Sequence, residues 1–217
     1  MPRISYSAIL SWIAGLARRS RMDTQGVAAI EFAFIAPIMV LMFIGAVELS
    51  QAIIVDRRVT QASSSIADLV ARQENKMLFS EMTDIVRIGG FILAPYDQAP
   101  LEVTVRNVSS SPSNAENTKQ SWECTAKGAN AEPNCTCTNL TYLLPRPGLV
   151  TTNDSVVVAE VKYTYMPRVF DYFLKGAPTG GGGPGTYTLS ERVFMKPRGV
   201  AAVLKKKDGT ECGTPTY

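Results

Sequence analysis

The 217-residue sequence contains no histidine, and this absence excludes several kinds of active site. Serine and cysteine hydrolases of the common types need a histidine beside the nucleophile, and many zinc sites need histidine ligands. Pairs of carboxylates remain possible in principle, but the sequence places no pair of acids in one cleft. We therefore predict no catalytic residue, no cofactor and no metal site, and we expect that the protein is not an enzyme.

An excess of positive charge is also missing from most of the chain. The formal net charge is +3, and residues 1–26, with four arginines and one acid, account for all of it. The formally neutral remainder has no basic stripe with interleaved aromatic side chains, which proteins that bind single-stranded nucleic acid need. The run from Lys205 to Lys207 precedes Asp208 and Gly209 and is typical of a solvated turn. Nucleic acid is therefore not an expected partner.

A long uncharged run is the strongest feature that the sequence does contain. Residues 32–47 include no charged side chain, and with residues 27–31 the apolar stretch is about 21 residues long, enough to cross a bilayer as a helix. The arginines before it predict that residues 1–26 stay in the cytoplasm while the C-terminal part crosses. A cleavable secretory signal has a similar pattern, but this run is too long and no small-residue cleavage site follows Val47. We predict a retained anchor and membrane lipid as a partner.

An acid lies inside this apolar stretch, at Glu31. An ionisable side chain costs about 2.5 to 3.5 kcal/mol at the centre of a membrane helix, so Glu31 is expected to have a partner or a function. The segment from Gly26 to Phe32 resembles the type IV prepilin processing site, which is a glycine, four residues, a glutamate and an aromatic residue. This resemblance implies that a membrane prepilin peptidase cuts between Gly26 and Val27.

Cleavage would create a new amine at Val27, one helical turn before Glu31. The two positions are about 6 Å apart along a helix axis, so a neighbouring helix shifted by that rise would bring its amine beside the carboxylate. A buried opposite charge is the partner that Glu31 needs. The alternative is an uncleaved anchor in which Glu31 reaches the headgroups.

Beyond the span, the hydrophobic periodicity predicts an α+β protein. One long helix is expected over residues 27–73, and a shorter one over residues 77–93. Alternating or β-branched runs predict strands, and an antiparallel sheet is the simplest arrangement for them. These strands are expected at residues 101–108, 155–165 and 186–196. Turn-rich segments predict surface loops at residues 109–120 and 176–185.

All four cysteines, Cys124, Cys135, Cys137 and Cys212, fall on the side of the membrane where disulfides persist. Cys135 and Cys137 are too close in an extended chain for an easy mutual bridge. We therefore expect Cys124 to pair with one of these two and Cys212 with the other. A four-thiolate metal site is the alternative, but the paired Cys-x-x-Cys spacing of such sites is missing.

The segment DTQGVAAIEFAFIAPIMVLMFIGAVELSQ resembles the N-terminal region of TadE-like proteins, the minor pilins or pseudopilins of the tight-adherence (Tad) pilus system. The VVVAEVKYTYMPR stretch at residues 156–168 is also similar to a strand of this family. The resemblance implies a pilin-like ectodomain with an antiparallel sheet behind a long transmembrane helix. It also implies a single-span inner-membrane protein whose C-terminal domain lies in the periplasm or in the extracellular pilus. Its expected partners are prepilin peptidase, other pilin or pseudopilin subunits and the pilus assembly platform.

The expected organisation has four parts: a cytoplasmic basic leader (1–26), the transmembrane helix (27–50), a helical stalk with the second helix (51–95), and a β-rich extracytoplasmic domain (96–217). Two other functions fit a tether followed by a folded domain. One is an unprocessed TadG-like assembly scaffold that keeps its N-terminus in the inner membrane. The other is a membrane-tethered periplasmic enzyme or receptor, which a deep pocket lined by convergent carboxylates would favour.

Overall fold

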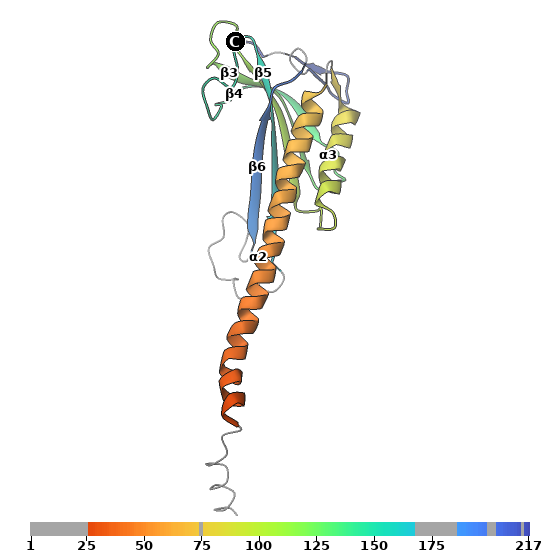
Figure 1. Cartoon of the computed structure of the whole chain (residues 1–217). Helices are drawn as coiled ribbons and strands as arrows, with labels where there is room; N and C mark the ends of the chain where they lie inside the picture. Colours follow the sequence, from red (N-terminus) through yellow and green to blue (C-terminus); the bar gives the residue numbers. More distant parts are fainter. Residues whose placement is uncertain (1–25, 74–75, 168–185, 199–202, 214) are drawn as a thin grey trace, which may run out of the picture. The chain divides into compact units, whose positions relative to one another are not determined.

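The computed structural model describes residues 26–73, 76–167, 186–198, 203–213 and 215–217 (Figure 1). The chain is α+β, as the sequence predicted, with a long apolar helix followed by a mostly antiparallel sheet. It divides into two compact units, Met1–Val47 and Glu48–Tyr217. The elements in chain order are α2 (Val27–Ala71), β1 (Met77–Leu78), α3 (Phe79–Leu93), β2 (Leu101–Ser110), β3 (Thr118–Lys127), β4 (Asn134–Thr141), β5 (Ser155–Tyr165), β6 (Tyr187–Met195), β7 (Leu204–Lys205) and β8 (Glu211–Cys212).

Helix α2 ends two residues before the predicted position, at Ala71. From Glu48 onward it contains no glycine or proline, and its buried side chains recur three or four residues apart. This spacing puts them on one face of the helix. Val55, Val59, Ile66 and Val70 are all at most 1% exposed and belong to the main core of the second unit.

The second predicted helix begins two residues later than the sequence indicated. Met77 and Leu78 form the short strand β1, which pairs in parallel with β7. The side chain of Met77 is fully buried, so tertiary packing draws these residues into a strand. The carboxylate of Glu81 then accepts a hydrogen bond of 2.8 Å from the backbone nitrogen of Leu78, and α3 begins at Phe79.

Five strands form the main sheet in the order β4-β3-β2-β5-β6, and every neighbouring pair is antiparallel. The predicted strands correspond to β2, β5 and β6, and their positions are confirmed within about two residues. Helices α2 and α3 lie over one face of this sheet (Figure 1). Trp122 of β3 and Val105 of β2 are fully buried between the sheet and the helices.

The predicted loop at residues 109–120 is wrong at both ends. Ser109 and Ser110 continue β2, and residues 118–120 begin β3, so only residues 111–117 connect the two strands. These polar residues pair in register across the hairpin, with Ser110 opposite Thr118. Strands β3 and β4 were not predicted, because their polar sequences lack the hydrophobic alternation of a half-buried strand. The predicted loop at residues 176–185 lies outside the described residues.

Candidate membrane span and processing site

Helix α2 contains the feature on which the functional interpretation depends. Within the part of the chain that the structure describes, it is the one helix long and apolar enough to cross a membrane. The residues of its most apolar window are not buried against the rest of the protein. Phe32, Phe34 and Phe43 are each at least 68% exposed. An exposed apolar surface of this length is unfavourable in water and matches the hydrocarbon thickness of a bilayer.

The proposed processing residues lie together at the start of this helix. Gly26 immediately precedes the first residue of α2, Val27. Apart from its chain neighbours, no described residue lies within 4 Å of the position that a Cβ atom would take at Gly26. Val27 and Glu31 are four residues apart in regular helix, so both are on the same side of α2. Phe32 is the next residue and is 68% exposed. Val27, Glu31 and Phe32 are therefore all exposed within the described part of the chain.

The burial of side chains differs between the two ends of α2. The exposed apolar residues of the first unit give way to a one-sided buried stripe that begins at Val55. Arg57 and Asp56 are on the exposed side of this second part. Helix α2 thus combines a candidate span, apolar all round apart from Glu31, with a two-sided segment that forms part of the core of the second unit.

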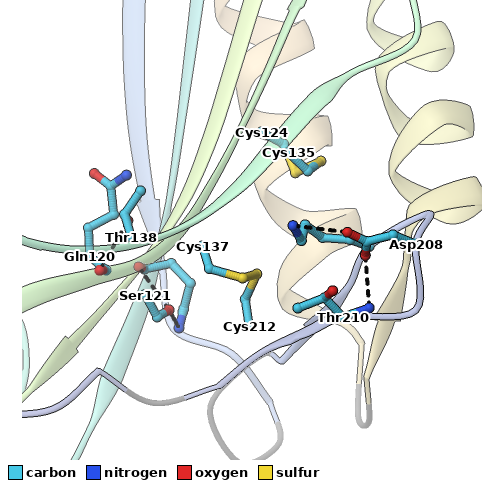
Figure 2. The surroundings of a disulfide bond; sticks show 11 residues. Gln120, Ser121, Cys124, Cys135, Cys137, Thr138, Asp208, Thr210 and Cys212 are labelled. Carbon is cyan, nitrogen blue, oxygen red and sulfur yellow. Dashed lines mark hydrogen bonds and ion pairs between the residues drawn. A yellow bond between two sulfur atoms is a disulfide. The ribbon is translucent and has the colours of Figure 1, made fainter.

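The four cysteines form two disulfides, as the sequence predicted (Figure 2). No described cysteine is therefore free to hold a metal. Cys124 is bonded to Cys135, and the two lie directly opposite each other on β3 and β4 with their Cα atoms 4.0 Å apart. Cys137 is bonded to Cys212, which is 75 residues away. The sequence had left open which of Cys135 and Cys137 pairs with Cys124, and the structure shows that it is Cys135.

The second disulfide attaches the C-terminal segment to the edge of the main sheet. Cys212 belongs to β8, which pairs with β7, and β7 pairs with β1 in a small three-stranded sheet. A turn at Gly209 joins β7 to β8, and Asp208 accepts a hydrogen bond from the backbone nitrogen of Thr210 at 2.8 Å (Figure 2). The Cys137–Cys212 bridge therefore links the small sheet of β1, β7 and β8 to β4, the edge strand of the main sheet.

A row of charged side chains crosses the sheet on the face away from the helices. Arg106 of β2 lies directly opposite Glu123 of β3, and its Nε donates to Glu123 Oε2 at 2.6 Å. Its Nη1 donates to Glu160 Oε2 of β5 at 2.9 Å. Glu160 also contacts Lys162 at 3.2 Å and Arg192 of β6 at 3.3 Å. Sequence reasoning missed this row, because alternation identifies the outer face of a strand but not the cross-strand register.

Burial raises the pKa of Glu160, but its partners more than offset this effect. Hydrogen bonds from Arg106, Lys162 and Arg192, together with the positive charge of Arg192, hold the pKa of the carboxyl at about 2. The carboxylate is therefore ionised at neutral pH. Its ion-pair partners are Arg106 and Arg192 on the two neighbouring strands and Lys162 on its own strand, so the arrangement stabilises the sheet and does not make Glu160 a proton donor at neutral pH.

The described residues offer little support for a catalytic centre. One open cleft lies beside α3 and is bordered by Asp84, Glu132 and the lysines at 205–207. Glu132 contacts Lys207 at 3.0 Å, and Asp84 contacts Arg87 at 3.8 Å, so each of these acids has a basic partner at the border of the cleft. Among the residues placed in the structure, no group of three or more histidine, cysteine or acidic residues is arranged to hold a metal ion.

These features define an α+β protein with one candidate membrane-spanning helix at its N-terminal side and a disulfide-linked, mostly antiparallel domain behind it. Residues 26–68 match the family model described as TadE-like protein, and this match confirms the resemblance predicted from the sequence. The match includes most of α2 and does not extend into the strands. No curated protein and no solved structure was found to match the chain.

Proposed function

We propose that this chain is a minor pilin or pseudopilin of a Tad-type adhesion pilus, processed by prepilin peptidase after Gly26. The observation that carries the proposal is the position of the family match. The matched segment begins at Gly26 and includes the apolar helix, the acid at Glu31 and the first turns of the ectodomain core. No enzyme activity, cofactor or nucleic acid is part of this proposal.

The leader, residues 1–26, is on the cytoplasmic side of the inner membrane in this proposal. The peptidase reaches the bond between Gly26 and Val27 at the membrane edge, where the absence of a side chain on Gly26 lets the backbone enter a narrow active site. The ectodomain is then in the periplasm, an oxidising compartment in which both disulfides persist. This orientation agrees with the arginines that precede the span.

Cleavage prepares the subunit for assembly because it creates a positive charge near the negative charge of Glu31 in the apolar span. The new amine at Val27 of one subunit pairs with Glu31 of the next, and the exposed aromatic residues of α2 pack against neighbouring helices as the subunit leaves the bilayer. Phe32 and Phe34 are 68% and 75% exposed and provide large apolar surfaces for this packing. Other pilin subunits and the inner-membrane assembly platform are therefore the partners.

The test of processing is the intact mass of the protein co-expressed with a prepilin peptidase. We expect the mass to fall by that of residues 1–26, and we expect Gly26→Ala to abolish the change. Gly45→Ala, a matched substitution within the same helix but away from the cleavage site, should be processed like the unmodified protein. An unchanged mass for the unmodified protein would contradict the proposal and favour the unprocessed scaffold.

The test of assembly is the amount of the protein in filaments sheared from the cell surface. Glu31→Gln removes the carboxylate with little change in size, and we expect it to be processed but largely absent from the filaments. Asp56→Asn is the control, because Asp56 is an exposed acid on the same helix outside the apolar run. Equal incorporation of both variants would show that Glu31 has no role in assembly.

A further inference from the structure

One end of the folded domain carries exposed apolar and aromatic side chains next to the point where α2 enters it. We call this end the base and define it by Gln51, Phe91, Tyr96, Met166 and Tyr187. Phe91 is 73% exposed, Met166 58% and Tyr187 40%. They come from α3, from the end of β5 and from the start of β6, so separate parts of the sequence contribute to the same end.

Several contacts hold the loop after α3 against helix α2 at the base. The hydroxyl of Tyr96 donates a hydrogen bond of 2.8 Å to Oε1 of Gln51. Nη1 of Arg58 donates to the carbonyl oxygens of Ile92, at 3.1 Å, and Ala94, and its guanidinium lies 5.6 Å from the centre of the Tyr96 ring. The exposed Phe91 is therefore on a segment tied to the first ectodomain turns of α2.

Further contacts connect the same loop to the strand ends. The hydroxyl of Tyr163 donates to the carbonyl oxygen of Asp97 at 2.9 Å, and the backbone nitrogen of Thr164 donates to the carbonyl oxygen of Pro100. Tyr165 lies directly opposite Tyr187 in the sheet register. These contacts place the start of β6 and the end of β5 at the end of the domain that holds Gln51.

Gln51, one of the residues that define the base, follows the candidate span closely in the sequence. Gln51 is four residues after Val47, the last residue of the uncharged run, and α2 is helical throughout. Four residues of helix correspond to about 6 Å along its axis. Tyrosine and tryptophan are enriched at the headgroup level of membrane proteins, and basic side chains close to a span are attracted to anionic headgroups.

We infer that the base is a second membrane contact, in which Phe91, Met166 and Tyr187 enter the headgroup region of the leaflet from which α2 emerges. This inference rests on the proposed function, because it requires α2 to cross a bilayer. Lipid is favoured over a second copy of the chain because the bilayer begins within a few residues of Gln51, whereas another copy must diffuse to this surface. Contact with lipid removes the exposed apolar area of three side chains from water.

Tryptophan fluorescence with brominated lipid tests this inference. The full-length protein is reconstituted in vesicles of phosphatidylethanolamine and phosphatidylglycerol, with or without phosphatidylcholine brominated near the headgroup end of its acyl chains. Trp12→Phe removes one natural tryptophan, and the fully buried Trp122 remains as a constant background. Phe91→Trp reports on the base. Phe43→Trp, at a position that is 70% exposed, is the matched reporter for the span.

Leu143→Trp is the control for an exposed apolar side chain away from the base. Leu143 is 84% exposed and follows Tyr142, whose backbone nitrogen donates to Thr118 at the opposite end of the sheet. The ten residues of β2 separate the two ends by about 30 Å. We expect the quenching of Phe91→Trp to be about half that of Phe43→Trp or more, and several-fold that of Leu143→Trp.

The three reporters distinguish the possible failures. If Phe43→Trp is quenched but Phe91→Trp is quenched no more than Leu143→Trp, the inference about the base is wrong and the span stands. If Phe43→Trp is not quenched, the membrane span of the proposed function fails as well. Quenching of Phe91→Trp that disappears as the protein-to-lipid ratio is raised would show that a second copy covers the base, and would overturn lipid as its partner.

Discussion

Arg106 and Glu160 form a hydrogen-bonded ion pair of 2.9 Å across strands β2 and β5, on the face of the sheet opposite the helices. The side chains are only 19% and 8% exposed. Because Arg106 also pairs with Glu123, a single guanidinium holds three neighbouring strands together. Separating a pair this well buried costs free energy, since removing one partner leaves the other with fewer opposite charges in a poorly solvated place.

Substitution of Glu160 by glutamine should therefore destabilise the folded domain by about 2 to 3 kcal/mol, because Arg106, Lys162 and Arg192 lose their shared anion. The measurement is the urea midpoint of the full-length protein in detergent, followed by near-ultraviolet circular dichroism. Glu116→Gln, in an exposed loop, is the control and should change the stability by less than about 0.5 kcal/mol. A result in which the two variants have equal midpoints would contradict the prediction.

The pH dependence of stability should also report on Glu160. Its pKa of about 2 in the folded protein is below the ordinary value of 4.5, so the ionised form stabilises the fold. That contribution is fully present above the ordinary pKa of the unfolded chain and is lost as the pH falls from 4.5 toward 2. We expect the melting temperature of the unmodified protein to fall more steeply than that of Glu160→Gln in this range. Parallel curves would argue against the assigned role.

The two disulfides should contribute unequally to stability. The bridge from Cys137 to Cys212 closes 75 residues, and that from Cys124 to Cys135 closes 11. Loop-closure entropy predicts about 4 to 5 kcal/mol for the first and about 3 kcal/mol for the second. Paired serine substitutions avoid a free thiol, and denaturant unfolding of the two double variants gives the comparison. A larger loss for the 124–135 pair would mean that local packing, not loop length, determines the effect.

Adjacent glycines in α3 offer a matched test of how closely this helix approaches its neighbours. A Cβ atom at Gly90 would lie 2.1 Å from the Cβ atom of Ala129 and 3.3 Å from its Cα atom, so backbone would have to move. At Gly89 the close neighbour is the Cδ1 atom of Ile66 at 2.7 Å, the end of a flexible side chain. We expect Gly90→Ala to cost about 1 to 3 kcal/mol.

Gly89→Ala is the control for this prediction, because alanine gains up to about 1 kcal/mol in helix propensity and Ile66 can change its rotamer. Its net effect on the free energy of unfolding should therefore be small. Thermal or urea unfolding of the two variants gives the difference. If Gly90→Ala is as stable as Gly89→Ala, the result would contradict the close approach of Ala129 to Gly90 in α3.

The anchor and the processing segment could be proposed from the sequence because their signals are local. An uncharged run of membrane length and a glycine five residues before a glutamate lie within one stretch of chain, and the match to the TadE-like model covers the same stretch. The three most apolar strands and both long helices were also recognisable, since their periodicity results directly from one-sided burial.

The polar strands and the base could not be predicted in this way. Strand β4 consists mostly of threonine, asparagine and cysteine. It is a strand because β3 provides a hydrogen-bonding partner, and Cys124 of β3 is bonded covalently to Cys135 of β4. The contact between Tyr96 and Gln51 joins residues 45 positions apart, which no local pattern encodes.

By itself the sequence determined the membrane-length helix and the α+β class, and it was the basis for the peptidase site that we propose at Gly26, because each depends on residues near one another in the chain. Tertiary structure alone decided which cysteines pair, how Arg106 and Glu160 meet, and which exposed side chains gather beside Gln51. The physical reason is register: antiparallel pairing brings distant residues within contact distance, and a shift of one residue would send every side chain to the other face.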